Sequence, residues 1–433
     1  MLHPLKEMME RRKVGITCGI PSYCSANEFV IEAALERARD TGRPTLIEAT
    51  ANQVNQFGGY SGMKPQDFMD FVSEIAGRTG TDRELFILGG DHLGPLTWSD
   101  ESEKEAMGKA EELVREYILA GFTKIHLDTS MKLGDDPKEG PLSTETIAKR
   151  GVRLYQVCME AFEQLKLKSP DAIRPVFIIG SEVPIPGGAQ EKEEGIQVTR
   201  PEDFEDTVNT YKRIFKEEKF EHAWEDMIAI VVQPGVEFGD TQVFSYDSEK
   251  AQSLCGKLKE YPEIVFEGHS TDYQSRDCLK KMVEDGIAIL KVGPALTFGL
   301  RESLFALSMI EKELIPEENQ AYFKEILDRS MLEHPQNWIK HYHGNEKELA
   351  FARKYSFSDR CRYYIGDKKM ADAINKLLNN LFDIEIPMGI LHQYMPKQFE
   401  KIQSGILKPE PRTLAKDGIV EFMEDYEYAS YYL

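Results

Sequence analysis

Eight short apolar segments, each followed by a longer amphipathic one, constrain the fold of this chain more than any other feature. The short runs are rich in β-branched side chains and lack polar alternation, which is typical of parallel strands buried on both faces, although a buried helix can show the same pattern. The intervening segments have apolar residues at helical spacing. Eight strands that alternate with eight helices predict an α/β fold, the (β/α)8 TIM barrel. The predicted strands are residues 14–18, 44–49, 85–89, 124–127, 175–179, 227–232, 263–266 and 287–292, and the predicted helices are 28–39, 65–75, 102–119, 143–165, 200–216, 247–259, 275–283 and 301–314.

The main alternative is a doubly wound open sheet. Such a sheet usually carries a glycine-rich phosphate-binding turn after its first strand, and the segment ITCGIPSYCS lacks the GxGxxG spacing. Strand-like runs stop near residue 315, and the rest of the chain is helix-prone, aromatic and charged. We therefore predict a barrel at residues 1–314 and a C-terminal helical appendage at residues 315–433 that packs on the barrel.

Charge and composition exclude several classes of protein. The 74 acidic and 53 basic residues give a net charge of −21, and the charges are scattered, which argues against binding to nucleic acid or to an anionic membrane. The N-terminal segment MLHPLKEMMERRKVG has no apolar core of a signal peptide, and no apolar run is long enough to span a bilayer. The six cysteines show no CxxC spacing and are expected to be reduced. We expect a cytoplasmic globular protein.

Polar residues should gather at the carboxyl ends of the strands, because TIM-barrel active sites are built there. The sequence meets this expectation at every predicted strand. The polar residues in or just beyond the predicted strands include Ser22, Ser25, Glu48, Asn52, Asp91, His92, His126, Asp128, Glu182, Gln233, Glu267, His269, Ser270, Asp272 and Lys291.

Two histidines and one carboxylate in this set could form a divalent-metal site. His92 and His269 follow strands that face each other across the barrel mouth, and Glu182 arrives between them. The alternative is that each histidine is a hydrogen-bonded structural residue, which is the commoner role at a strand end. Asp91 could act as a general acid or base, or could hold a loop in place.

A phosphate site is a second possibility at the same end of the barrel. Gly235, Gly268, Ser270 and Gly293 could offer backbone N–H groups after the last strands, where barrels often bind phosphate. Glycines also serve any tight turn, so this pattern alone does not distinguish the two roles.

Segments along nearly the whole chain closely resemble the tagatose-bisphosphate aldolase accessory-subunit family. They include IEATANQVNQFGGYSGM, ILGGDHLGP, KIHLDTSM, GSEVPIPGG, AIVVQPGVEF, EGHSTDYQ, ILKVGPALTF and IPMGILHQYMPKQFEKIQSG. The resemblance implies a (β/α)8 barrel and the metal-site framework of class II aldolases. The family was first described as a non-catalytic subunit that supports a catalytic class II aldolase. Other members resemble stand-alone 4-epimerases that interconvert D-fructose 6-phosphate and D-tagatose 6-phosphate, or act on free fructose.

The resemblance also implies roles for individual residues. Asp91 and His92 resemble the aldolase pair in which the aspartate transfers a proton and the histidine holds the metal, and His269 resembles a second metal histidine. Gln233 stands where class II aldolases have another metal histidine, and this departure leaves the ligand set open. Glu182 would then complete it, with Gln233 contacting the metal or the substrate.

From the resemblance we expect a metal-dependent ketose or ketose-phosphate 4-epimerase that uses a retro-aldol step. The metal would be zinc, with manganese, cobalt and nickel as alternatives. Asp91 is the first candidate for the proton shuttle, followed by Asp128 and Glu48, with Glu182 counted among the catalytic residues. We expect a homo-oligomer, and the alternative function is a subunit that supports a class II aldolase. The predicted substrate contacts are Glu48, Asn52, Gly235, Ser270, Asp272, Lys291 and Gly293, although Gly293 replaces an asparagine of the aldolases.

Basic and aromatic residues of the predicted appendage could cap the barrel mouth or bind a 6-phosphate group. Packing and surface ion pairs are the better explanation for each of them taken singly. These residues are Arg360, Arg362, Tyr363 and Lys397.

Overall fold

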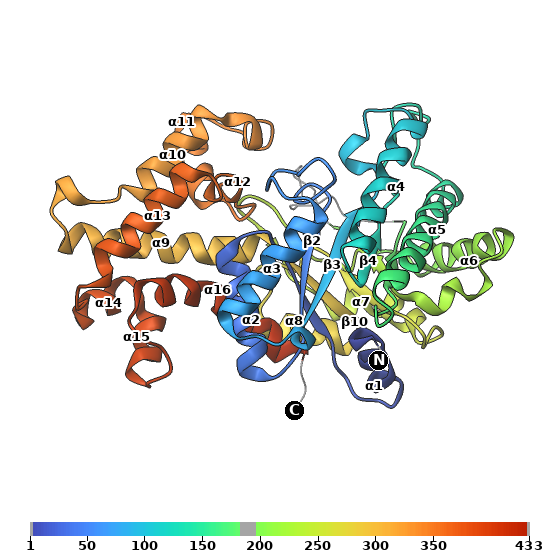
Figure 1. Ribbon diagram of the computed structural model, residues 1–433, viewed down its shortest axis with the longest axis horizontal. Coiled ribbons are helices and arrows are strands. Elements are labelled where there is room, and N and C mark those ends of the chain that lie inside the picture. Colours follow the sequence, from blue (N-terminus) through green and yellow to red (C-terminus); the bar gives the residue numbers. More distant parts are fainter. Residues whose placement is uncertain (1–2, 182–195, 431–433) are drawn as a thin grey trace.

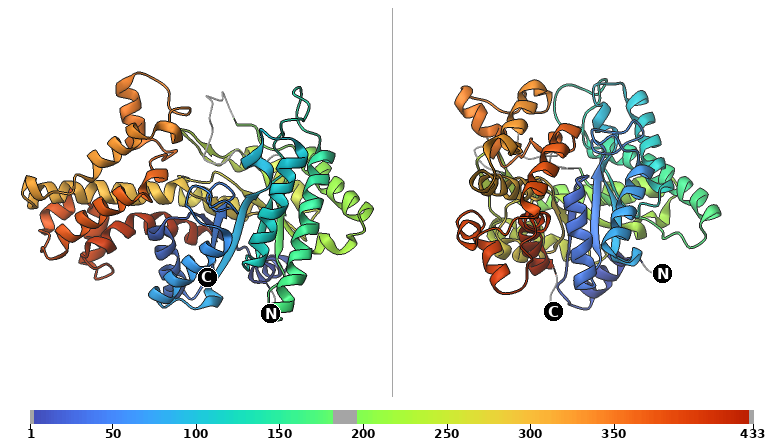
Figure 2. Two further views of the ribbon diagram at one scale, coloured as in Figure 1. Left: turned by 45° about the horizontal axis from the view of Figure 1, so that its top comes forward. Right: turned by 60° about the vertical axis from the view of Figure 1, so that its left-hand side comes forward.

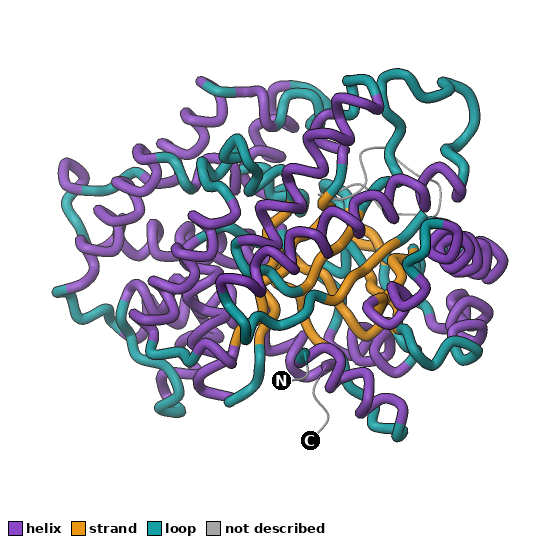
Figure 3. The backbone as a smooth tube through the Cα atoms, turned by 45° about the vertical axis from the view of Figure 1, so that its right-hand side comes forward, coloured by secondary structure: helices purple, strands orange, loops and turns teal. Residues whose placement is uncertain are grey.

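A closed barrel of eight parallel strands forms the centre of the computed structural model, which describes residues 3–181 and 196–430 (Figure 1). Helices surround the strands on all sides (Figure 3). The predicted TIM barrel is confirmed. In order around the barrel the strands are β1 (Ile20–Cys24), β2 (Thr45–Thr50), β3 (Phe86–Leu93), β4 (Lys124–Leu127), β5 (Val176–Ile179), β6 (Met227–Val232), β9 (Val265–Gly268) and β10 (Ile287–Val292).

The helices that follow the first seven barrel strands begin within one residue of their predicted starts. Most have a Ser, Asn or Asp at the N-cap whose side chain accepts a backbone N–H, as at Asn27 and Ser102, and such caps fix where a helix begins. A small hairpin, β7 (Glu237–Phe238) and β8 (Val243–Phe244), follows β6. The helices are α2 (Glu28–Thr41), α3 (Pro65–Thr79), α4 (Glu103–Leu119), α5 (Thr144–Lys168), α6 (Pro201–Glu217), α7 (Ser248–Leu258) and α8 (Arg276–Glu284). Short 3-10 turns are η1 (Arg83–Leu85), η2 (Pro95–Trp98), η3 (Glu221–Asp226), η4 (Glu317–Asn319) and η5 (Pro335–Asn337).

The predicted first strand at residues 14–18 is wrong. Val14 and Ile16 in this run are 75% and 47% exposed, and the chain turns here before the true strand β1 begins at Ile20. The strand β1 was missed because it contains Pro21 and Ser22, and proline and serine are poor strand formers. Ser22 therefore lies inside the strand and not beyond its end.

Helix α1 (Pro4–Lys13) closes the amino-terminal end of the barrel. Its buried side chains Leu5, Met8 and Met9 pack in one cluster with residues at the beginning of the strands, such as Leu46 and Ile228. This apolar plug leaves the carboxyl ends of the strands as the open end of the barrel.

After β10 the chain forms a long helix, α9 (Pro294–Leu314), that extends away from the barrel (Figure 1, Figure 2). Six further helices gather beside it, and the last helix, α16 (Pro411–Ser430), returns to pack against α2, α8, α9 and β1. The contact with α9 needs glycine, because a Cβ atom on Gly299 would lie 2.3 Å from the carbonyl oxygen of Gly418. The six helices are α10 (Phe323–Glu333), α11 (Glu346–Tyr355), α12 (Arg362–Ile365), α13 (Lys368–Phe382), α14 (Met388–Tyr394) and α15 (Pro396–Gln403). None of the described helices is long and apolar enough to cross a membrane.

His3 gives the fold a testable pH dependence. Its Nδ1 accepts the backbone N–H of Leu5 at 3.1 Å, which requires an unprotonated imidazole, and burial lowers the pKa of His3 to about 4. Between pH 6.5 and pH 4 the unfolded chain therefore binds a proton that the folded chain does not, so the stability that His3 contributes is present above pH 6.5 and is lost as the pH falls. The loss is on the order of 3 kcal/mol at most.

We expect the His3→Asn variant to remove this dependence, because asparagine caps helices well without titrating. The midpoint of thermal unfolding should decrease from pH 7.5 to pH 5 in both proteins, and the decrease should be smaller in His3→Asn than in the wild type. An equal fall in both proteins would contradict the assignment.

Candidate active site

The interior of the barrel changes from apolar to charged along the strands. Alternate side chains of each strand point inward, and the inward residues near the amino ends, such as Ile20 and Leu46, join the apolar cluster beneath α1. The next inward layer consists of polar and charged side chains that are completely or almost completely buried. We call this layer the ionic layer, and its members are Ser22, Glu48, Lys124, Glu267 and Lys291.

The ionic layer is held together by short contacts between opposite charges. The Lys124 Nζ atom lies 2.8 Å from Glu48 Oε1 and 2.8 Å from Glu267 Oε2, and the Lys291 Nζ atom lies 2.9 Å from Glu48 Oε2. A Cβ atom on residue 89 would lie 2.8 Å from Glu48 Cγ, so Gly89 leaves the room that this carboxylate needs. Buried charges are tolerated only when each one is paired in this way.

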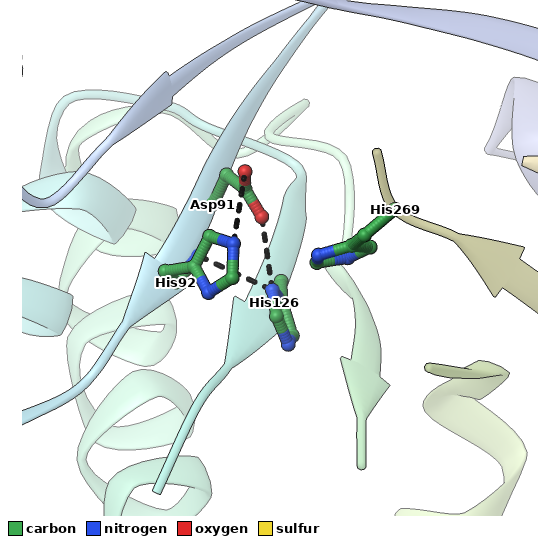
Figure 4. Close-up of side chains that lie close together, drawn as sticks. All are labelled: Asp91, His92, His126 and His269. Atoms are coloured by element: carbon green, nitrogen blue, oxygen red, sulfur yellow. Dashed lines mark hydrogen bonds and ion pairs between the residues drawn. The ribbon is translucent and has the colours of Figure 1, made fainter. Parts of the chain in front are cut away.

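Above the ionic layer, one aspartate and three histidines converge (Figure 4). Asp91 and His92 come from β3, His126 from the neighbouring β4, and His269 from the turn after β9, which lies opposite β3. All four are buried, and each offers one ligand atom within 4.8 Å of the others. These four residues could hold a metal ion, and we call them the metal-ligand cluster.

Asp91 links the cluster to the ionic layer. Its Oδ1 atom lies 2.7 Å from Lys291 Nζ and 2.9 Å from His126 Nδ1, and its Oδ2 atom lies 3.7 Å from His92 Nε2. Burial would raise the pKa of Asp91, but the neighbouring charges of His92 and Lys291 hold it well below its usual value. Asp91 is therefore ionised at neutral pH.

Two carboxylates orient the histidines of the cluster. His92 Nδ1 lies 2.8 Å from Asp128 Oδ2, and His269 Nε2 lies 2.9 Å from Glu267 Oε1. Burial lowers the pKa of His269 to about 3, so its imidazole is neutral, whereas the charges of Asp91 and Asp128 outweigh burial and raise the pKa of His92. His92 also has a φ of 49°, a costly conformation for a side-chain-bearing residue and one that clusters at functional sites.

A cavity of about 700 Å³ opens above the cluster. Five of the predicted substrate contacts line it: Asn52, Ser270, Asp272, Lys291 and Gly293. The other two, Glu48 and Gly235, are absent from the described lining, since Glu48 belongs to the ionic layer beneath and Gly235 lies in the turn after β6.

Asp272 holds the loop after β10 in place at the cavity wall. Its Oδ1 atom accepts the backbone N–H groups of Gly293 at 3.1 Å and Ala295 at 2.8 Å. Burial raises the pKa of Asp272 to about 6.

One predicted metal residue, Gln233, does not join the cluster. The side-chain oxygen of Gln233 accepts the backbone N–H groups of Gly235 at 2.8 Å and Val236 at 3.1 Å, so it closes its own turn. Glu182, predicted as both a ligand and a catalytic residue, lies outside the described residues.

Sequence reasoning did not assign roles to three residues that the geometry makes central, namely His126, Lys124 and Glu267. A signal was available, because Lys124 and His126 are two positions apart in a strand, as are Glu267 and His269 at the end of another. Residues two apart share one face of a strand, so each pair had to point together into the barrel or out of it.

Comparison with known proteins identifies the family. Residues 5–431 match the family described as "D-tagatose-1,6-bisphosphate aldolase subunit GatZ/KbaZ-like". The chain belongs to this family. It is 42% identical to a protein from Sinorhizobium meliloti whose crystal structure is that of "a probable tagatose 6 phosphate kinase", with a TM-score of 0.87 over 95% of this chain and 100% of that one.

More distant structures include two aldolases. The fructose-bisphosphate aldolase of Campylobacter jejuni is 15% identical, with a TM-score of 0.43 over 87% of this chain and 91% of that one. The YdjI aldolase of Escherichia coli is 13% identical, with a TM-score of 0.42 over 84% of this chain and 96% of that one. Likenesses of this size carry no functional information.

From the ionic layer we predict that replacing a buried lysine lowers the free energy of unfolding much more than replacing an exposed one. Lys124→Met leaves the fully buried Glu48 and Glu267 with too little positive charge, so we expect the free energy of unfolding to fall by about 3–5 kcal/mol. Lys149→Met, which removes an exposed partner of Glu145, should have little effect. Urea denaturation of both variants tests this, and equal stabilities would show that the buried charges are not coupled.

Proposed function

We propose that this protein is a metal-dependent ketose 4-epimerase. It would interconvert D-fructose 6-phosphate with D-tagatose 6-phosphate, or the corresponding free sugars, by breaking and remaking the bond between C3 and C4. The observation that carries the proposal is the convergence of three histidines and an ionised aspartate, of which Asp91, His92 and His269 line a cavity large enough for a sugar phosphate. The family description and the name of the Sinorhizobium meliloti relative both concern tagatose phosphates, which supports this substrate class.

The chemistry explains why a metal and a base would both be needed. The hydrogen on C4 is not adjacent to the C2 carbonyl, so its removal gives no stabilised carbanion. Breaking the C3–C4 bond does, because the bonding electrons then flow into the C2 carbonyl. When the aldehyde fragment turns over and the bond forms again on its other face, the configuration at C4 is inverted.

The donor set of the cluster fits a divalent transition metal. Imidazole and carboxylate ligands suit zinc, and also manganese, cobalt and nickel. The Nε2 atom of His126 is buried without a hydrogen-bond partner among the described residues, so this nitrogen is available as a metal ligand. His92, His126 and His269 would hold the ion, with Glu182 as a further predicted ligand. The bound ion would supply a Lewis acid that stabilises negative charge on substrate oxygens.

The protein's own residues would manage the proton. Asp91 is ionised and lies in the cavity wall, so it can take the proton from the C4 hydroxyl as the C3–C4 bond breaks. It returns the same proton to O4 when the bond forms again. Lys291 and His126 hold Asp91 in place, and Asp128 orients His92.

The second candidate function is that of a subunit that supports a class II aldolase. The family description, which names an aldolase subunit, favours it. In that case the purified chain should raise the heat stability or the activity of an added class II aldolase and should not convert a ketose by itself.

Histidine variants test the proposed centre. We expect His126→Ala and His269→Ala to lose bound metal, measured by mass spectrometry of the purified proteins, and to lose more than about 100-fold in the rate of epimerisation. His222→Ala is the matched control, because its side chain is 89% exposed and pairs only with Glu225 among the described residues. Full metal content and turnover in both cluster variants would rule out this site.

A further inference from the structure

One wall of the cavity comes from the segment that follows the barrel. Tyr60, in the loop after β2, packs edge-on against Tyr363 with ring centroids 4.9 Å apart, and Arg362 lies beside them. All three line the same cavity as Asp91 and His92. The cavity therefore spans from the metal-ligand cluster to a group of polar side chains supplied by another part of the chain.

The basic side chains that the structure describes in this cavity wall are Lys291, Arg362 and Arg412. Lys291 is neutralised by Asp91 and Glu48. Arg412 is neutralised by glutamates of α2, among them Glu32. Arg362 is the third of these basic side chains.

Arg362 has no ion pair with any carboxylate in the part of the chain that is described. Its Nη1 donates to the backbone carbonyls of Ser358 and Asp359, and its Nη2 donates to the Tyr363 hydroxyl at 2.9 Å. A guanidinium has five N–H donors, and Arg362 also hydrogen-bonds the Tyr60 hydroxyl, so one N–H remains for a ligand. A guanidinium without a carboxylate partner is a strong donor for a phosphate group.

Tyr60 adds a neutral donor beside this cation. Burial raises the pKa of Tyr60 to about 12, so its hydroxyl stays protonated at neutral pH. The chain as a whole carries a net charge of −21, which repels anions, so an anionic ligand needs local positive charge of this kind.

We propose that Arg362, assisted by Tyr60, anchors the phosphate group of a phosphorylated ketose. This inference rests on the proposed function and narrows its substrate class to the sugar phosphate. The reacting C3–C4 bond must lie at the cluster, and a 6-phosphate lies at the far end of the sugar, where a separate anchor is needed. Arg362 acts in binding and takes no part in the proton transfer.

Steady-state kinetics with two substrates test the anchor. For Arg362→Gln we expect a KM for fructose 6-phosphate about 10- to 100-fold higher, the loss typical of a charge-assisted hydrogen bond, with kcat/KM for free fructose within about twofold of wild type. Arg360→Gln is the matched control, because Arg360 lies over the same Tyr363 ring but is absent from the described cavity lining. An equal loss on both sugars, or an unchanged KM for fructose 6-phosphate, would overturn the proposal.

A binding measurement separates this proposal from the proposed function. Calorimetry with inorganic phosphate should show binding to the wild type and to Arg360→Gln, and at least tenfold weaker binding to Arg362→Gln. If the wild type converts neither sugar, the proposed epimerase function is wrong, but the phosphate-binding measurement still tests whether Arg362 binds phosphate. Arg362→Lys keeps the positive charge but loses the planar guanidinium, so its affinity for phosphate should lie between those of the wild type and Arg362→Gln. It serves as the second variant if Arg362→Gln unfolds at a lower temperature. Equal phosphate binding by all variants would refute the anchor.

Discussion

Mutual neutralisation of charges sealed inside the barrel is the interaction on which the rest of this site depends. Lys124 and Lys291 are buried among Glu48, Glu267 and Asp91, and little of any of these groups is exposed to a solvent that could stabilise its charge. Each position is therefore fixed by its neighbours, since a displaced charge would lose its partner in a medium of low dielectric constant.

The ionic layer also fixes the positions of residues in the metal-ligand cluster above it. Glu267 lies in the ionic layer and also contacts His269, while Lys291 contacts Asp91. The orientation of Asp91 and His269 thus depends on the layer below them, while Asp128, just after β4, orients His92. A site preorganised in this way needs little rearrangement at the moment of reaction.

The segments after the barrel complete the molecule in two ways. Helix α16 packs against β1 and the helices around it, so the end of the chain helps to cover the barrel. Helix α12, which carries Arg362 and Tyr363, supplies a wall of the cavity and contacts the loop after β2. We propose that the residues after about 315 contribute to substrate binding through Arg362, together with Tyr60 of the barrel, while the catalytic groups lie in the barrel.

Most of the barrel was predictable, because parallel strands buried on both faces leave strong apolar runs and capped helices leave Ser, Asn and Asp signals. The strand β1 was not, because Ser22 faces the ionic layer and Pro21 accompanies it, so the strand lacks an apolar run. His92 and His269 were found as residues at strand ends. His126 was noticed within its strand but given no role, since only the closed barrel shows that it points at the other two. Arg362 was one of four candidates in the predicted appendage, and the sequence could not single it out, because the contact between the loop after β2 and residue 363 joins distant parts of the chain.

The most direct test of a retro-aldol epimerase is to incubate the purified chain alone with fructose 6-phosphate in D2O, with added divalent metal or with chelator, and to follow the sugar by NMR. The account predicts that tagatose 6-phosphate forms only with metal and keeps its original hydrogen on C4, because the C–H bond at C4 is never broken. No product from the chain alone, or deuterium at C4 of the product, would contradict it.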